Sequence, residues 1–357
     1  MAEKKRTRWQ RRPGTTGGKL PWNDWRNATT WRKATQLLLL AINIYIAITF
    51  WYWVRYYETA GSTTFVARPG GIEGWLPIAG LMNLKYSLAT GQLPSVHAAA
   101  MLLLVAFIVI SLLLKKAFCS WLCPVGTLSE LIGDIGNKLF GRQFVLPRWL
   151  DIPLRGVKYL LLSFFLYIAL LMPAQAIHYF MLSPYSVVMD VKMLDFFRHM
   201  GTATLISMIV LLIASLFIRH AWCRYLCPYG ALMGVVSLLS PFKIRRNAES
   251  CIDCGKCAKS CPSRIPVDKL IQVRTVECTG CMTCVESCPV ASTLTFSLQK
   301  PAANKKAFAL SGWLMTLLVM GIMFAAIGYA IYAGVWQSPV PEELYQRLIP
   351  QSPMIGH

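Results

Sequence analysis

Two stretches in the second half of the chain, CIDCGKCAKSCP (residues 251–262) and CTGCMTCVESCP (residues 278–289), contain eight of its twelve cysteines. In each stretch two residues separate the first, second and third cysteines, three residues precede the fourth, and a proline follows it. Thiolates repeated at such short intervals can surround one metal centre, so the spacing is typical of metal sites and not of a disulfide framework. The sequence therefore predicts two neighbouring metal centres in this segment.

Both stretches match the C-x2-C-x2-C-x3-C-P pattern of bacterial ferredoxins without a deviation. Cysteine pairs with CxxC spacing also bind zinc, an alternative that two tandem four-cysteine runs disfavour. In two-cluster ferredoxins the fourth cysteine of each run ligates the other cluster. This pattern assigns one [4Fe–4S] cluster to Cys251, Cys254, Cys257 and Cys288, and the second to Cys278, Cys281, Cys284 and Cys261. Eight ligands for two clusters leave no open iron position, so no catalytic residue is predicted.

The rest of the chain is unusually apolar. Of its 357 residues 55% are hydrophobic and 15% are charged, with a mean hydropathy of +0.47, which indicates a membrane protein with a modest soluble part. Five apolar stretches approach or exceed the length of about 20 residues that a helix needs to cross a bilayer. They run over residues 34–54, 96–114, 157–172, 202–218 and 308–335.

These features predict the fold class. We expect an all-α polytopic membrane protein with about five transmembrane helices and an inserted small α+β two-cluster ferredoxin domain of the bacterial type. Short strands are expected on both sides of the cysteine runs, in KIRRN from Lys243 and in TLTFSL from Thr293. The predicted regions are a basic cytoplasmic N-terminal segment (1–33), a four-helix membrane domain (34–240), the ferredoxin domain (241–300), and a fifth helix with an extracytoplasmic tail (301–357).

The formal net charge of +20 comes largely from lysines and arginines that flank the apolar stretches. Because such residues mark the cytoplasmic side of a membrane protein, we expect the N-terminus and the ferredoxin domain in the cytoplasm and the C-terminal tail in the periplasm. Nothing in the sequence resembles a module that reads nucleic acid, so no nucleic-acid partner is expected.

A second cysteine motif ends two of the apolar stretches: AFCSWLCPVG at residues 117–126 and AWCRYLCPYG at residues 221–230. Its recurrence predicts a duplicated unit of two helices and one CxxxCP motif. Helical spacing puts the two cysteines of each motif on one face, and the following proline disfavours helix before it. Three interpretations stay open for Cys119, Cys123, Cys223 and Cys227: apolar packing, redox-active thiols, or four ligands of one shared iron or iron–sulfur centre. Four nearby cations would favour thiolates, namely Lys115, Lys116, Arg219 and Arg224.

Histidines and aromatic residues near the predicted outer ends of the spans give weaker signals. A quinone headgroup site near the aromatic residues at 51–57 and His97 or His178 is one interpretation, but anchoring at the membrane interface is the default explanation for such aromatics. No pair of histidines has the spacing expected for haem ligation on one helix, and no C-x-x-C-H motif occurs. A solvated loop is one interpretation of the charged residues Asp190, Lys192, Asp195 and Arg198, and no proton-transfer residue is singled out among them.

Paired CxxxCP motifs at span ends, followed by two ferredoxin runs, resemble the NapH/NosR family of membrane-bound 4Fe-4S polyferredoxins over nearly the whole chain. The resemblance implies a protein of the bacterial inner membrane that passes electrons between the quinone pool and a redox partner, with its clusters on the cytoplasmic side. NosR-like members have a large extracytoplasmic flavin-binding region, for which the loop at 55–95 is too short. A NosR-like regulatory link to copper enzymes is therefore not expected.

The residues and the resemblance together predict a membrane-bound iron–sulfur electron-transfer protein. We expect it to relay electrons between the quinone pool or a cytoplasmic donor and an unidentified partner protein, without substrate chemistry of its own. Two other functions stay open: a metal-reducing factor in the maturation of a metalloenzyme, and a redox-sensing membrane protein. The expected cofactors are two [4Fe–4S] clusters, and a further iron or iron–sulfur centre at the CxxxCP motifs and a bound quinone stay open.

Overall fold

The computed structural model describes residues 27–141, 144–298 and 308–355. Most of the predicted basic segment at 1–33, and residues 301–307 of the predicted last region, therefore lie outside the described residues. Chain contacts divide the protein into two compact units. The first unit comprises Met1–Leu38, Ile108–Thr127 and Gly230–Gly321, and the second comprises Leu39–Phe107, Leu128–Tyr229 and Ile322–His357.

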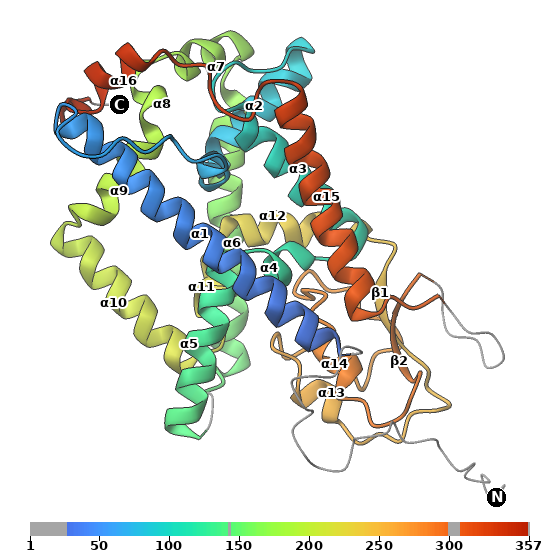
Figure 1. Ribbon diagram of the computed structural model, residues 1–357. Helices are drawn as coiled ribbons and strands as arrows, with labels where there is room; N and C mark the ends of the chain where they lie inside the picture. The colour runs from blue at the N-terminus through green and yellow to red at the C-terminus, as the bar shows by residue number, and fades with distance from the viewer. Residues whose placement is uncertain (1–26, 142–143, 299–307, 356–357) are drawn as a thin grey trace, which may run out of the picture. The chain divides into compact units, whose positions relative to one another are not determined.

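Three helices are long and apolar enough to cross a membrane: α1 (Ala28–Glu58), α6 (Arg148–Leu171) and α15 (Gly312–Tyr332) (Figure 1). They coincide with the stretches predicted at 34–54, 157–172 and 308–335. Only 11–22% of the residues in their most apolar windows are buried within the protein. A helix that is apolar yet largely uncovered by protein is typical of a membrane span.

The other two predicted spans are not simple crossing helices. α3 (Ala98–Leu114) has 17 residues, fewer than the 20 or so that a bilayer requires. α10 (Thr202–Phe217) is long enough only together with α9 (Met189–Arg198), from which it is bent by 79°. The described residues thus contain three candidate spans, or four if the bent pair is one span. The count of five remains a prediction.

The second unit adds several shorter helices. Their bounds are η1 (Ile72–Trp75), α2 (Pro77–Thr90), α7 (Ala174–Met181), α8 (Pro184–Val187), α11 (Ala221–Tyr225), α16 (Glu342–Leu348) and η3 (Ser352–Met354). An apolar core joins the C-terminal half of α1 to α16, with the ring centroids of Trp53 and Tyr345 5.0 Å apart. The aromatic group at 51–57 is therefore divided, since Trp53 and Tyr57 are buried in this core while Trp51 and Tyr52 are exposed.

The first unit contains the cysteine runs. Its elements are α4 (Ala117–Trp121), most of α12 (Pro228–Val236), η2 (Ser237–Leu239), β1 (Lys243–Arg246), α13 (Lys256–Lys259), α14 (Thr283–Glu286) and β2 (Leu294–Ser297), while α5 (Pro124–Phe140) runs from this unit into the second. β1 pairs antiparallel with β2, and Ile244 lies opposite Phe296 with both side chains buried. One short helix lies within each cysteine run, and the two helices contact each other. Two strands and two short helices make up the ferredoxin-like α+β domain.

Candidate metal centres

The first cysteine-lined hollow lies between α13, the N-terminal end of β2 and the end of the second cysteine run. Four cysteines border it, with about 350 Å³ of atom-free space that includes space open to solvent: Cys251, Cys254, Cys257 and Cys288. Cys254 is exposed, whereas Cys257 and Cys288 are buried. Three thiols of one run and the fourth thiol of the other therefore border one space.

The second hollow has the same composition with the roles of the runs exchanged. It also holds about 350 Å³, and its four cysteines are Cys261, Cys278, Cys281 and Cys284. The lining is otherwise mainly apolar, with Ile244, Val273 and Met282 among its residues. The cysteines around each hollow are the four that the ferredoxin pattern assigns to one cluster, although the ligation itself stays a prediction.

The thiols of the second hollow suit an iron–sulfur cluster. Burial raises the pKa of Cys278 to about 12 and moves the pKa of Cys284 well above its ordinary value. These thiols are neutral at pH 7 without a metal, so iron binding has to displace their protons. Sulfur donors are the ligands that iron–sulfur clusters take. Among the described residues no three His, Cys, Asp or Glu side chains gather closely enough to hold a single metal ion. The thiols are therefore too far apart to share one ion and instead surround an open space.

Each cysteine run contains one glycine, at a different position: Gly255 follows the second cysteine of its run, whereas Gly280 precedes the second cysteine of its own. Gly255 and Gly280 have φ values of 65° and 64°, in the left-handed region that favours glycine. A Cβ on Gly255 would meet open space, whereas a Cβ on Gly280 would lie 3.0 Å from the carbonyl oxygen of Leu114. The loop of the second run is therefore packed against the end of α3.

Gly280→Ala is expected to destabilise the first unit more than Gly255→Ala. Either alanine takes a left-handed φ at a cost of about 1 kcal/mol. At position 280 the new Cβ also presses on a carbonyl oxygen, which adds about 1 kcal/mol or more. Thermal unfolding and iron content of the two variants, prepared side by side, check this order. Equal losses at both positions would contradict the close approach.

The α4 helix, which carries the first cysteine of one CxxxCP motif, is hydrogen-bonded to this same loop. Ser120 Oγ donates to the carbonyl of Thr279 (2.7 Å), and the buried Trp121 donates through Nε1 to the carbonyl of Gly280 (3.3 Å). Gln36 Nε2 of α1 donates to the carbonyl of Ser120 (2.9 Å). The CxxxCP segment thus supports one wall of the second hollow, a role that the sequence did not reveal.

The two CxxxCP motifs have the same local structure. α4 and α11 are five residues long, and the next helix begins at the proline of the motif in both cases. The glycine of the first motif, Gly126, is required because a Cβ there would lie 2.3 Å from the carbonyl oxygen of Cys119. All four motif cysteines are half-buried. One pair belongs to the first unit and the other to the second, so their convergence on one metal stays a prediction.

The arginines that were expected to favour thiolates at these motifs have carboxylate partners. Arg224 contacts Asp151 through two hydrogen bonds of 3.0 Å, and Arg219 pairs with Asp134. These arginines therefore neutralise acids of their own unit, and their effect on the motif thiols stays a prediction. Lys115, by contrast, is fully buried in the first unit, close enough to Cys278 for a charge on that sulfur to raise the pKa of the lysine.

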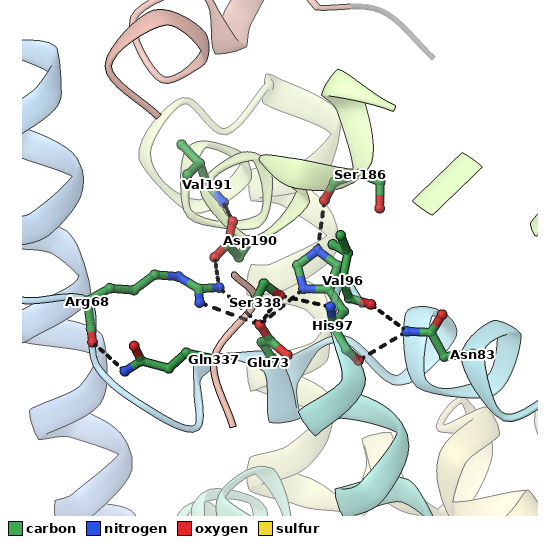
Figure 2. A network of polar contacts seen from close by, with 10 residues as sticks. All are labelled: Arg68, Glu73, Asn83, Val96, His97, Ser186, Asp190, Val191, Gln337 and Ser338. Carbon is green, nitrogen blue, oxygen red and sulfur yellow. Dashed lines mark hydrogen bonds and ion pairs between the residues drawn. The ribbon is translucent and has the colours of Figure 1, made fainter. Parts of the chain in front are cut away.

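A buried ionic network in the second unit was missed from the sequence (Figure 2). Arg68 pairs with Asp190 at 2.8 Å and lies 3.4 Å from Glu73. His97 donates through Nε2 to the carbonyl of Ser186 (2.8 Å), while its Nδ1 lies 3.4 Å from Glu73 Oε1. The four titratable side chains are at most 8% exposed. Asp190 is fully buried, so the interpretation of 190–198 as a solvated loop does not hold for this residue.

The segment after α15 closes this network. Ser338 Oγ donates to Glu73 Oε1 (2.7 Å) and accepts from the backbone N–H of His97 (2.8 Å). Burial opposes the charge of Glu73, but its pKa lies below the ordinary value because His97 and Arg68 face it. The only sequence signal was that Arg68 and Glu73 are two of the few charges in the loop at 55–95.

Comparison with known proteins places these motifs in families. A family model described as "4Fe-4S binding domain" matches residues 96–143 and 200–247, and one described as "4Fe-4S dicluster domain" matches residues 243–289. Each match of the first model contains one CxxxCP motif, and the match of the second contains both ferredoxin runs. No solved structure matches the chain.

Three curated relatives share these features. The chain is 96% identical, over the full length of both chains, to "Putative electron transport protein YccM" of Escherichia coli (strain K12). It is 30% identical to "Ferredoxin-type protein NapH" of the same organism, over 56% of this chain and 67% of that one. It is also 30% identical to "Regulatory protein NosR" of Pseudomonas aeruginosa, over 53% of this chain and 26% of that one. With two ferredoxin runs, two CxxxCP motifs and apolar spanning helices, the chain belongs to the NapH/NosR-type family of membrane-bound 4Fe-4S electron transport proteins.

Proposed function

We propose that the protein relays electrons through two [4Fe–4S] clusters, between the quinone pool or a cytoplasmic donor and a partner redox protein. The observation that carries the proposal is the pair of hollows, each bordered by three cysteines of one run and one of the other. The proposed ligands are Cys251, Cys254, Cys257 and Cys288 for the first cluster, and Cys261, Cys278, Cys281 and Cys284 for the second. A bound [4Fe–4S] cluster supplies reversible one-electron transfer.

The protein's own residues hold and shield these centres. Ile244, Val273 and Met282 border the second hollow with apolar surface that excludes water. The hydrogen bonds from Ser120 and Trp121 fix its loop in place. Cys254 is exposed at the first hollow, which makes that centre the one that a soluble partner protein approaches.

The proposal includes a location and a domain plan. The lysine and arginine distribution supports an inner-membrane protein of a bacterium, with the N-terminus and the ferredoxin domain (241–300) in the cytoplasm and the C-terminus in the periplasm. The four-helix membrane domain at 34–240 and the fifth helix with its tail at 301–357 belong to the same plan. The relatives' printed names, which refer to electron transport and to a ferredoxin type, agree with a relay.

At the CxxxCP motifs we propose an additional iron or iron–sulfur centre. Its ligands are Cys119, Cys123, Cys223 and Cys227. The support is that a family model described as 4Fe-4S binding matches twice and that each matched stretch contains one motif. Repetition of the whole local structure, from five-residue helix to proline-initiated helix, also favours a shared role over casual packing.

Iron and acid-labile sulfide content of anaerobically purified protein, with EPR during a quinol titration, tests the proposal. Two clusters predict about eight irons and eight sulfides per chain, and quinol is expected to reduce them. Reduction by a low-potential cytoplasmic reductant but not by quinol would assign the donor to the cytoplasm. Protein that is folded but holds no iron would contradict the relay.

The third centre has its own readout. Iron above about eight per chain, lost in the Cys119→Ala/Cys223→Ala variant, is the expected result. The eight ferredoxin ligands remain in that variant, so the two-cluster EPR signals serve as its internal control. Equal iron in both proteins would leave the motif to thiol chemistry or packing.

A further inference from the structure

Lys115 is a buried cation with no hydrogen-bond partner in the part of the chain that the structure describes. Its side chain is 0% exposed, and its Nζ contacts no acceptor among the described residues. Burying an unpaired ammonium is costly unless an anion lies close to it. The position of Lys115 therefore calls for a negative charge, and no described side chain supplies it through a hydrogen bond.

The base of the Lys115 side chain lies beside the loop that borders the second hollow. Lys115 follows α3 with a φ of 62°, and its N–H donates to Ser240 Oγ (3.1 Å). A Cβ on Gly280 would lie 3.5 Å from the Lys115 Cβ, so the base of the lysine side chain lies against the loop that begins at Cys278. Burial lowers the pKa of Lys115 and the charge of Lys243 lowers it further, whereas a negative charge on the Cys278 sulfur opposes this lowering.

We infer that the Lys115 ammonium is the buried counter-charge of the second [4Fe–4S] cluster and favours the reduced state of that cluster. The inference rests on the proposed function, since it takes the second hollow as the position of a cluster. A [4Fe–4S] cluster with four thiolates is an anion, and one-electron reduction makes it more negative. A fixed positive charge stabilises the reduced form more than the oxidised form, most strongly where water is excluded.

The electron in this step comes from the donor of the relay, quinol or a cytoplasmic reductant. The second cluster gains that electron, and the donor is oxidised by one electron. No proton moves at Lys115, because the lysine is an ammonium in both states. The inference thereby assigns the charge of Lys115 to the second ferredoxin cluster, whereas the sequence alone assigned it to the nearby CxxxCP thiols.

The first hollow has different charged surroundings. Arg246 and Asp268 border it, and Arg246 lies 3.6 Å from the largely exposed carboxylate of Asp253. Lys256 directly precedes Cys257 in the sequence and is exposed. Water and salt screen an exposed charge far more than a buried one. Lys256 is therefore a matched control, because it places the same charge next to a cysteine of the other cluster in solvent.

An EPR-monitored redox titration of the full-length protein in detergent tests the inference, with Lys115→Met, Lys115→Arg and Lys256→Met as variants. In Lys115→Met the reduction of one cluster is expected to become about tenfold less favourable, a shift of about 59 mV to lower potential for a one-electron couple. The other cluster should change by less than about twofold in its equilibrium constant. Lys115→Arg and Lys256→Met should leave both clusters within about threefold, and higher salt should not abolish the effect of Lys115→Met.

Three results separate the inference from the proposed function. Unchanged midpoint potentials in Lys115→Met, with iron content equal to that of the unsubstituted protein, overturn the inference alone. Unsubstituted protein that folds without iron overturns the proposed function itself. If Lys115→Met does not assemble its second cluster, Lys115→Arg and Lys115→Gln replace it. A higher midpoint potential of the second cluster in Lys115→Arg than in Lys115→Gln, or assembly of that cluster in Lys115→Arg only, supports the inference. Equal midpoint potentials in the two variants, or loss of the second cluster in both, overturn it.

Discussion

Cys251→Ala/Cys288→Ala is expected to keep about four of the eight ferredoxin irons, whereas Cys251→Ala/Cys261→Ala is expected to keep almost none. Cys251 and Cys288 come from different runs but border the same hollow, so their removal eliminates one cluster. Cys251 and Cys261 come from the same run but border different hollows, so each cluster loses a ligand. Iron and acid-labile sulfide content, together with quantified EPR spins of the reduced protein, measures the difference.

The control for this pair is Cys254→Ala/Cys257→Ala, which removes two thiols of one run that border one hollow. It should also keep about four irons, since the second hollow remains complete. If each run instead held its own cluster, Cys251→Ala/Cys261→Ala would keep about four irons and Cys251→Ala/Cys288→Ala would lose nearly all. That reversed order would contradict the crossed ligation.

The cysteine runs could be read from the sequence because the information in them is local. Short, fixed intervals between thiols limit where the sulfur atoms can lie, and the glycine before or after a cysteine permits the left-handed turns seen at Gly255 and Gly280. The flanking strands were also predictable. β1 and β2 lie within the stretches that begin at Lys243 and Thr293, and alternation buries Ile244 opposite Phe296.

Contacts between distant segments were not predictable in this way. Trp121 and Gly280, which join α4 to the second hollow, are 159 positions apart, and Arg68 and Asp190 are 122 positions apart. Hydropathy records that Asp190 is charged, but not that the fold supplies an arginine for it, and so a solvated loop stayed open as an interpretation. Hydropathy likewise marks 202–218 as a complete span, whereas α10 reaches a spanning length only together with α9, across a 79° bend that hydropathy does not record.

Glu73→Gln is expected to lower the unfolding temperature of the detergent-solubilised protein at pH 7 by about 6–12 °C, the shift for a loss of about 3 kcal/mol in a unit of this size. The carboxylate lies at the centre of the buried network, where it accepts from Ser338 and faces Arg68 and His97 (Figure 2). A neutral amide keeps the volume but leaves buried cations with less compensating charge. Breaking a buried pair by removing one partner is therefore costly.

The pH dependence distinguishes this electrostatic cause from a packing defect. Because the folded protein holds the pKa of Glu73 below its ordinary value of 4.5, the stabilisation from its charge is complete above that value and declines as the pH falls below it. Although burial opposes the charge of His97, Glu73 holds the pKa of this histidine above its ordinary value. The difference in unfolding temperature between the unsubstituted protein and Glu73→Gln should therefore widen as the pH falls from about 8 to about 6, and shrink as the pH falls below about 4.5. Glu343→Gln, the same substitution at an exposed position of the same unit, should change the unfolding temperature little at any pH. A loss at Glu73 that did not vary over this pH range would show that the side chain's shape, and not its charge, holds the network together.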